Sequence, residues 1–181
     1  MPSLTVGLLT QFAMTLEELN SLTSVAADEE FLKCCGSTRW AHEMTRARPF
    51  TAAEELYEKA EEICASLDEH DWLEAFQAHP KIGERKAATD QSQQAQSWSA
   101  QEQAGLAQAL SQTKDSLAEL NRQYEARFGF IFIVCATGKS PEEMLAILQA
   151  RIDNSRTHEL LIAAEEQRKI TRLRLEKLLN Q

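Results

Sequence analysis

Apolar residues recur at every third or fourth position in several stretches of the chain, which is the spacing of one face of an α-helix. Glycine and proline are scarce, at six and four residues, and they fall between these periodic stretches. The clearest series are Leu56, Ala60, Ile63 and Leu67, and later Leu161, Ala164, Ile170, Leu173, Leu175 and Leu178. The pattern predicts a protein built mainly of helices that are separated by short turns.

Several helix starts carry a recognisable signal. A Ser or Thr followed three residues later by Glu can form a capping box, in which each side chain bonds the backbone N–H of the other residue. Such pairs occur at residues 15–18, 51–54, 99–102 and 140–143. Pro141 suits the first helical position of the last of these. Further helices are expected over residues 29–35 (ended by Gly36), over 68–79, from 99 to 124 (unbroken or interrupted near Thr113), and from 157 onward.

The most apolar run of the chain is Arg127–Ala136. Its length and β-branched content are typical of a buried strand. We find no clear partner strand in the sequence, so an irregular or helical buried segment is the alternative. Extended backbone here would leave N–H and C=O groups free to bind a planar polar ligand.

Composition narrows the class of protein. At 181 residues the chain is expected to form one domain with a sizeable core. Its net charge of −9 argues against nucleic acid or an anionic membrane surface as the main partner. No run approaches the roughly 18 apolar residues of a membrane span, and the N-terminus lacks a secretory signal. Four cysteines without a metal-type pair indicate reduced thiols in a cytoplasmic protein.

The segment His79-Pro80-Lys81-Ile82-Gly83 follows a stretch with helical spacing. A residue before proline is biased away from the helical region, and proline stiffens the turn. We therefore expect His79 to end the helix with its ring directed away from the helix face, where it can serve as an acid or base. The alternative is a histidine placed at a helix C-terminus by the helix dipole alone.

Two other groups have a structural and a functional interpretation. Ser99 and Glu102 have the spacing of a capping box, yet the N-terminus of their helix could equally face an anionic ligand. Arg172 and Arg174 belong to the basic residues of the last helix. Such residues usually form a solvated face, and the alternative is that one of them contacts a ligand.

The order of these segments resembles one family, 2-oxo-4-hydroxy-4-carboxy-5-ureidoimidazoline (OHCU) decarboxylase. The resemblance covers nearly the whole chain. Its matching segments are Phe31–Trp40, Arg48–Phe50, Asp71–Phe76, His79–Gly83, Ser99–Gln103, Tyr124–Phe132 and Lys169–Leu175.

The resemblance implies an all-α, single-domain bundle of about eight helices over residues 1–181. It also implies a homodimer, a small-molecule substrate, and no metal or organic cofactor. His79 would be the catalytic acid/base, and Glu102 the second catalytic residue. Residues expected to contact substrate are Pro80, Ser99, Ala100, Gln101, Gln103, Phe132, Ile133, Val134 and Arg174, with Arg172 as the alternative to Arg174.

The implied reaction converts the ureidoimidazoline to (S)-allantoin and CO2, the last step from urate to allantoin. The substrate bears its carboxylate on a carbon that also carries a hydroxyl and adjoins a C=N bond. The C=N bond can accept the electrons left by CO2, so the chemistry requires no pyridoxal or thiamine.

Two rival hypotheses belong to other classes. A non-catalytic helical interaction module would explain the amphipathic last helix and the acidic composition, but not a convergence of His79, Glu102 and Arg174. A different small-molecule lyase or hydrolase on the same scaffold would keep the cleft and fail on this substrate, because a fold alone does not fix a function.

Overall fold

The computed structural model describes residues 14–80 and 111–179. Every regular element in these two ranges is an α-helix. The helices are α1 (Leu16–Ser21), α2 (Ser24–Cys35), α3 (Thr38–Ala47), α4 (Ala53–Ser66), α5 (Glu69–Gln77), α8 (Ser111–Phe128), α9 (Pro141–Arg151) and α10 (Arg156–Leu178). The all-α prediction is thereby confirmed for the described residues, while the extent of a single domain over 1–181 stays a prediction.

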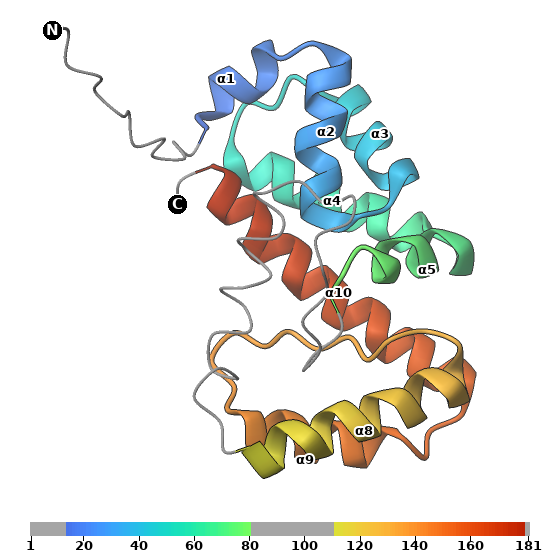
Figure 1. The fold of residues 1–181 in the computed structure, drawn as a ribbon. Helices are drawn as coiled ribbons and strands as arrows, with labels where there is room; N and C mark the ends of the chain where they lie inside the picture. The colour runs from blue at the N-terminus through green and yellow to red at the C-terminus, as the bar shows by residue number, and fades with distance from the viewer. Residues whose placement is uncertain (1–13, 81–110, 180–181) are drawn as a thin grey trace, which may run out of the picture.

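The long helix α10 connects the two ends of the molecule (Figure 1). Helices α1 to α5 lie around one half of it, with α2, α4 and α5 in contact with α10. Helices α8 and α9 pack against each other beside its other half. Residues on one face of α10 can therefore meet segments from both the early and the late parts of the chain.

The predicted capping boxes have different outcomes. Thr15 and Glu18 bond reciprocally at α1, and Ser140 and Glu143 do so at α9, as predicted. The prediction at 51–54 is wrong, because Ala52 is the N-cap of α4 and has no side chain to cap it. The carboxylate of Glu55 instead accepts from both the backbone N and the hydroxyl of Thr51, at 2.6 and 2.7 Å. The pair at 99–102 lies outside the described residues.

Helix α2 begins at Ser24, five residues earlier than the apolar spacing indicated, and ends at Gly36 as predicted. Gly36 adopts a left-handed conformation, with φ of 88°. A Cβ at this position would lie 2.6 Å from Cβ of Ala78. Glycine is therefore required here both by the backbone conformation and by the close approach of the residue that precedes His79.

The run 127–136 is not a strand. Helix α8 includes Thr113 without a break and continues to Phe128, and the residues that follow it form an irregular buried segment. No strand lies within the described ranges to pair with it. The irregular alternative was therefore the correct one.

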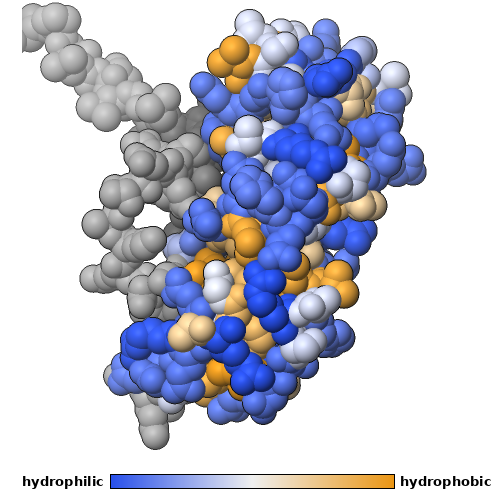
Figure 2. Space-filling view, turned by 90° about the vertical axis from the view of Figure 1, so that its right-hand side faces the viewer, coloured by the Kyte–Doolittle hydropathy of each residue, from blue (hydrophilic) through white to orange (hydrophobic). Residues whose placement is uncertain are grey.

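The core combines apolar faces from all eight helices of the described ranges. Trp40 and Met44 are fully enclosed, and Trp40 meets the ring of Phe31 edge-on at 6.0 Å. Full burial of a large apolar side chain stabilises a fold by about 1.5–3 kcal/mol. The face in Figure 2 is mainly hydrophilic, with hydrophobic residues gathered in a narrow band in its lower half. No helix of the described chain has the length and apolar character needed to cross a membrane.

Candidate functional site

His79 lies just beyond the end of α5. The helix ends at Gln77, and the backbone N of His79 donates to the carbonyl of Phe76 at 3.1 Å. Pro80 follows and is partly buried. The His79 ring reaches α10, where Nε2 lies 2.7 Å from Oε1 of Gln167. The histidine is thus held between two helices, as expected for a side chain on a stiffened turn.

Helix α10 supplies a buried polar face opposite His79. Gln167, Thr171 and Arg174 are spaced four and three residues apart, and none is more than 3% exposed. Nη2 of Arg174 lies 3.5 Å from Nδ1 of His79, and its Nη1 donates to the carbonyl of Lys33 at 3.4 Å. The first and last thirds of the chain therefore meet at this histidine.

The geometry also separates the two candidate arginines. Arg172 points elsewhere, where its guanidinium lies 3.6 Å from the ring centre of Tyr57 and pairs with Glu176. Arg174 is therefore the arginine that lies beside His79. A buried guanidinium next to a base offers a planar fork of donors to a carboxylate or ureido oxygen.

The environment of His79 favours the neutral imidazole. Burial, followed by the positive charge of Arg174, lowers the pKa of His79 from its ordinary value of 6.5 to about 3, against an opposing effect of the hydrogen bond to Gln167. Both main causes penalise the charged ring. At neutral pH the ring therefore carries one proton and keeps one nitrogen lone pair, the state required of a general base.

The segment that contains Phe132, Ile133 and Val134 is buried, with these side chains 2–6% exposed. The backbone N of Cys135 donates to Glu166 on α10 at 2.7 Å, next to Gln167 in sequence. Within the described part of the chain, no hydrogen bond involves the N–H groups of Phe132, Ile133 or Val134. These N–H groups are therefore candidate donors to a ligand, and their contact with substrate stays a prediction.

A buried ion pair anchors this segment. Nη1 of Arg151 donates to the carbonyl of Ile133 at 2.9 Å, and its Nε donates to Glu159 at 2.6 Å. Glu159 also accepts from the hydroxyl of Tyr124 at 2.5 Å and from Asn154 at 2.8 Å. Each buried charge is therefore satisfied by several partners, which such a pair requires in order to stabilise a fold.

Sequence reasoning did not identify Gln167, Arg151 or Glu159. A signal was present for two of them, because Gln167 and Glu159 lie at buried positions of α10 where the helical period calls for apolar residues. Polar residues at such positions require partners in the interior. Arg151 offered no comparable signal, because a basic residue in the last turn of a helix is ordinary.

Part of the predicted site cannot be compared with the structure. Ser99, Ala100, Gln101, Glu102 and Gln103 lie outside the described residues. Their convergence on His79 and Arg174 remains a prediction.

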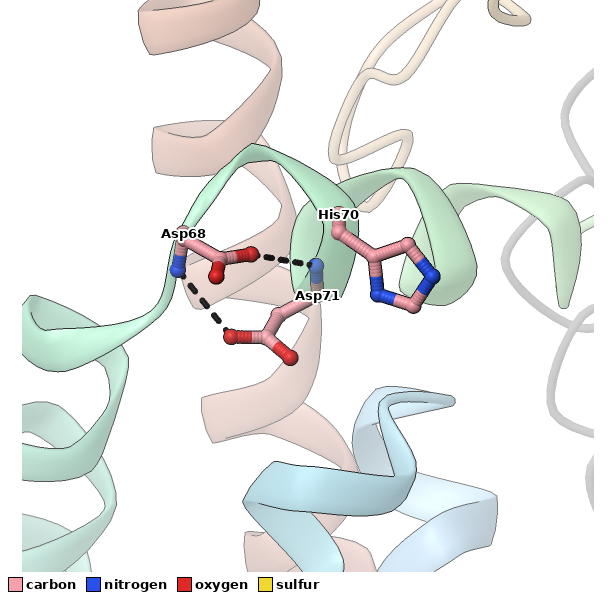
Figure 3. Close-up of side chains that lie close together, drawn as sticks. All are labelled: Asp68, His70 and Asp71. Atoms are coloured by element: carbon pink, nitrogen blue, oxygen red, sulfur yellow. Dashed lines mark hydrogen bonds between the residues drawn. The ribbon is translucent and has the colours of Figure 1, made fainter.

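One other cluster of potential ligands has a structural explanation. Asp68, His70 and Asp71 lie close together at the start of α5 (Figure 3). Asp68 and Asp71 form a reciprocal capping box, and Asp71 also pairs with Arg39 at 2.8 Å. These bonds explain why the two carboxylates lie close together, and the side chain of His70 is exposed.

Known proteins are similar to this chain both in sequence and in fold. The family model for OHCU decarboxylase matches residues 20–176. The chain is 39% identical over 151 residues to the uric acid degradation bifunctional protein TTL of Arabidopsis thaliana, covering 83% of this chain and 47% of that protein. It is 31% identical over 170 residues to an OHCU decarboxylase of Halalkalicoccus jeotgali, covering 91% of this chain and 92% of the relative.

A crystal structure of OHCU decarboxylase in the presence of (S)-allantoin superposes with a TM-score of 0.73 at 38% identity. It covers 84% of this chain and 99% of the other. Against the bifunctional proteins of Arabidopsis and of Bacillus sp. TB-90, the chain spans about half and about a third of their length. With a matching model over most of its length and a similar crystal structure, the chain belongs to the OHCU decarboxylase family.

Proposed function

We propose that the protein decarboxylates 2-oxo-4-hydroxy-4-carboxy-5-ureidoimidazoline to (S)-allantoin and CO2, without a cofactor, as the last step of urate conversion to allantoin. The observation that carries the proposal is the pairing of a neutral His79 with the buried Arg174 guanidinium. The histidine supplies a base at neutral pH, and the arginine supplies a positive charge for an anionic substrate.

The roles follow from the chemistry of the substrate. The bond to the carboxylate breaks, and its electron pair passes towards the adjacent C=N bond as CO2 leaves. The product then carries two new ring protons, one on nitrogen and one on the neighbouring carbon. One balances the proton lost from the substrate hydroxyl, which His79 accepts and returns, and the other comes from solvent.

Binding and orientation are assigned to the surrounding groups. Arg174 neutralises the substrate carboxylate, and the backbone of Phe132, Ile133 and Val134 donates to polar ring or ureido atoms. Pro80 shapes the wall beside His79. Ser99, Ala100, Gln101 and Gln103 complete the pocket by proposal, and Glu102 acts with His79 on the ureido or ring N–H groups.

We also propose an oligomeric state and a cellular location, each from a single line of support. The family resemblance suggests a homodimer, which light scattering on the purified protein would test. All four cysteines are free and buried, which is typical of a reducing compartment and supports a cytoplasmic location.

The test of the activity generates the unstable substrate in place. Urate is treated with uricase and the hydrolase that follows it, the protein is added, and circular dichroism follows the allantoin formed. The proposal predicts rapid appearance of a single enantiomer. A slow signal without optical activity, equal to the background without protein, would mean that the scaffold serves a different substrate.

A further inference from the structure

The Gln167 side chain is fully buried and has all of its polar atoms paired. Its Nε2 donates to the carbonyl of Cys35 at 3.3 Å and to the hydroxyl of Thr171 at 3.3 Å. Its Oε1 lies 2.7 Å from Nε2 of His79. A carbonyl oxygen only accepts hydrogen bonds, so the amide NH2 must face Cys35 and the amide oxygen must face the histidine.

This orientation determines which nitrogen of His79 carries the proton. The amide oxygen of Gln167 only accepts, so the short contact with Nε2 requires a proton on Nε2. On the other side of the ring, the guanidinium of Arg174 only donates, and its Nη2 faces Nδ1 at 3.5 Å. Nδ1 must then offer its lone pair, and the two neighbours independently require the same tautomer.

We propose that Gln167 is a positioning residue that holds His79 in the Nε2–H tautomer, so that Nδ1 is the nitrogen that takes up and returns the substrate proton. The tautomer is a property of the free protein, whereas the catalytic use of Nδ1 rests on the proposed function. Substrate binding would draw Arg174 to the carboxylate and uncover the Nδ1 lone pair. When Nδ1 accepts the hydroxyl proton, the Nε2–H bond to Gln167 becomes charge-assisted and stabilises the imidazolium.

A glutamine suits position 167 because its amide accepts a hydrogen bond from Nε2 without carrying a charge. A carboxylate at this position would also accept from Nε2, but its negative charge would favour the protonated ring and leave no lone pair on Nδ1. An apolar residue would leave Nε2 without an acceptor and would release the preference between the tautomers. Glutamine combines an acceptor for Nε2 with a donor for Cys35 and carries no charge.

The experiment is nitrogen-15 NMR of the ligand-free protein with labelled histidine, with the His79 signals identified by their loss in His79→Ala. The inference predicts a protonated Nε2 and an unprotonated Nδ1 in the wild type at neutral pH. Gln167→Met should populate the other tautomer and lower kcat at least about tenfold with KM nearly unchanged, because in this proposal Gln167 acts through His79 and not on the substrate. Thr171→Val is the matched control, because it removes one hydrogen bond of the amide and keeps the bonds to Cys35 and His79.

The outcomes distinguish the tautomer assignment from the proposed decarboxylase function. A proton on Nδ1 in the wild type would overturn the inference, whether or not Gln167→Met folds, as would an unchanged tautomer in folded Gln167→Met. Gln167→Glu should keep the proton on Nε2 and add one on Nδ1. A wild type with the predicted tautomer but no decarboxylase activity would refute the proposed function and leave the tautomer assignment intact.

Discussion

His79 and Arg174 are 95 residues apart in sequence, yet Nη2 of Arg174 lies 3.5 Å from Nδ1 of His79. A positive charge placed beside a histidine keeps that histidine neutral, and burial acts in the same direction. The arrangement therefore places a neutral imidazole and a guanidinium side by side, as the proposed mechanism requires.

The depressed pKa of His79 predicts a loss of stability in acid. Its pKa is about 3 in the folded protein and about 6.5 when unfolded, so the unfolded chain binds the proton first as the pH falls. The contribution is complete above pH 6.5 and declines towards pH 3, with a slope approaching 1.4 kcal/mol per pH unit. Urea unfolding of the wild type and of His79→Asn across this range measures it. The difference in unfolding free energy should shrink in acid, and parallel curves would contradict the assigned environment.

Gly36 should tolerate alanine poorly. The left-handed conformation costs a non-glycine residue about 1–2 kcal/mol, and the new Cβ would also collide with Ala78, next to His79. Gly138→Ala is the matched control, because it has a similar φ of 77° and nothing within 4 Å of the added Cβ. Thermal unfolding should show Gly36→Ala less stable than Gly138→Ala by a further 1–3 kcal/mol or so, the usual cost of overpacking. Equal losses would show that the close approach is easily relaxed.

The buried pair of Arg151 and Glu159 should be essential for stability. Arg151→Met leaves the Glu159 carboxylate buried without its cation, which typically costs about 3–5 kcal/mol. It also removes the donor to the Ile133 carbonyl, so the 129–136 segment should exchange its amide hydrogens faster. Denaturant unfolding and hydrogen exchange measure the two effects. Arg122→Ala, which breaks an exposed pair on α8, serves as the control and should change little; a similar result for Arg151→Met would refute the anchoring role.

Glu102→Gln distinguishes catalysis from helix capping. The substitution keeps the shape of the side chain and one acceptor oxygen, which suffices for helix capping, and removes its charge. A catalytic carboxylate predicts a fall in kcat of roughly 10²–10⁴-fold with little change in thermal stability. Glu54→Gln, in the exposed first turn of α4, is the control and should retain full activity. Normal turnover in Glu102→Gln would leave Glu102 with a capping role alone.

The helical fold was predictable because apolar spacing and capping pairs are local signals. The starts of α1 and α9 followed directly from Thr15 with Glu18 and from Ser140 with Glu143. The 51–54 pair failed because Glu55 was an equally near partner for Thr51, and a spacing rule does not choose between them. The 127–136 run was ambiguous because its apolar composition indicates only that it is buried. A strand also requires a partner strand, which composition does not reveal.

The site was only partly predictable. His79 was proposed from the turn that it forms with Pro80, whereas the substrate contact of Arg174 was assigned through the family resemblance. No local signal links residues so far apart in sequence. The partners that orient them depend on tertiary packing: Gln167 reaches the Cys35 carbonyl across 132 residues. Residues that orient a site residue in this way become evident only once α2, α5 and α10 are packed together.

The most direct test of the central claim compares two histidine variants in the coupled assay, with circular dichroism recording the enantiomer of allantoin. His79→Ala removes the proposed base, and His70→Ala removes an exposed histidine of the same helix region, α5. The account predicts that His70→Ala forms one enantiomer at the wild-type rate, whereas His79→Ala retains its helical spectrum and shows only the optically inactive background. Rapid formation of a single enantiomer by His79→Ala would contradict the assignment of His79 as the acid/base.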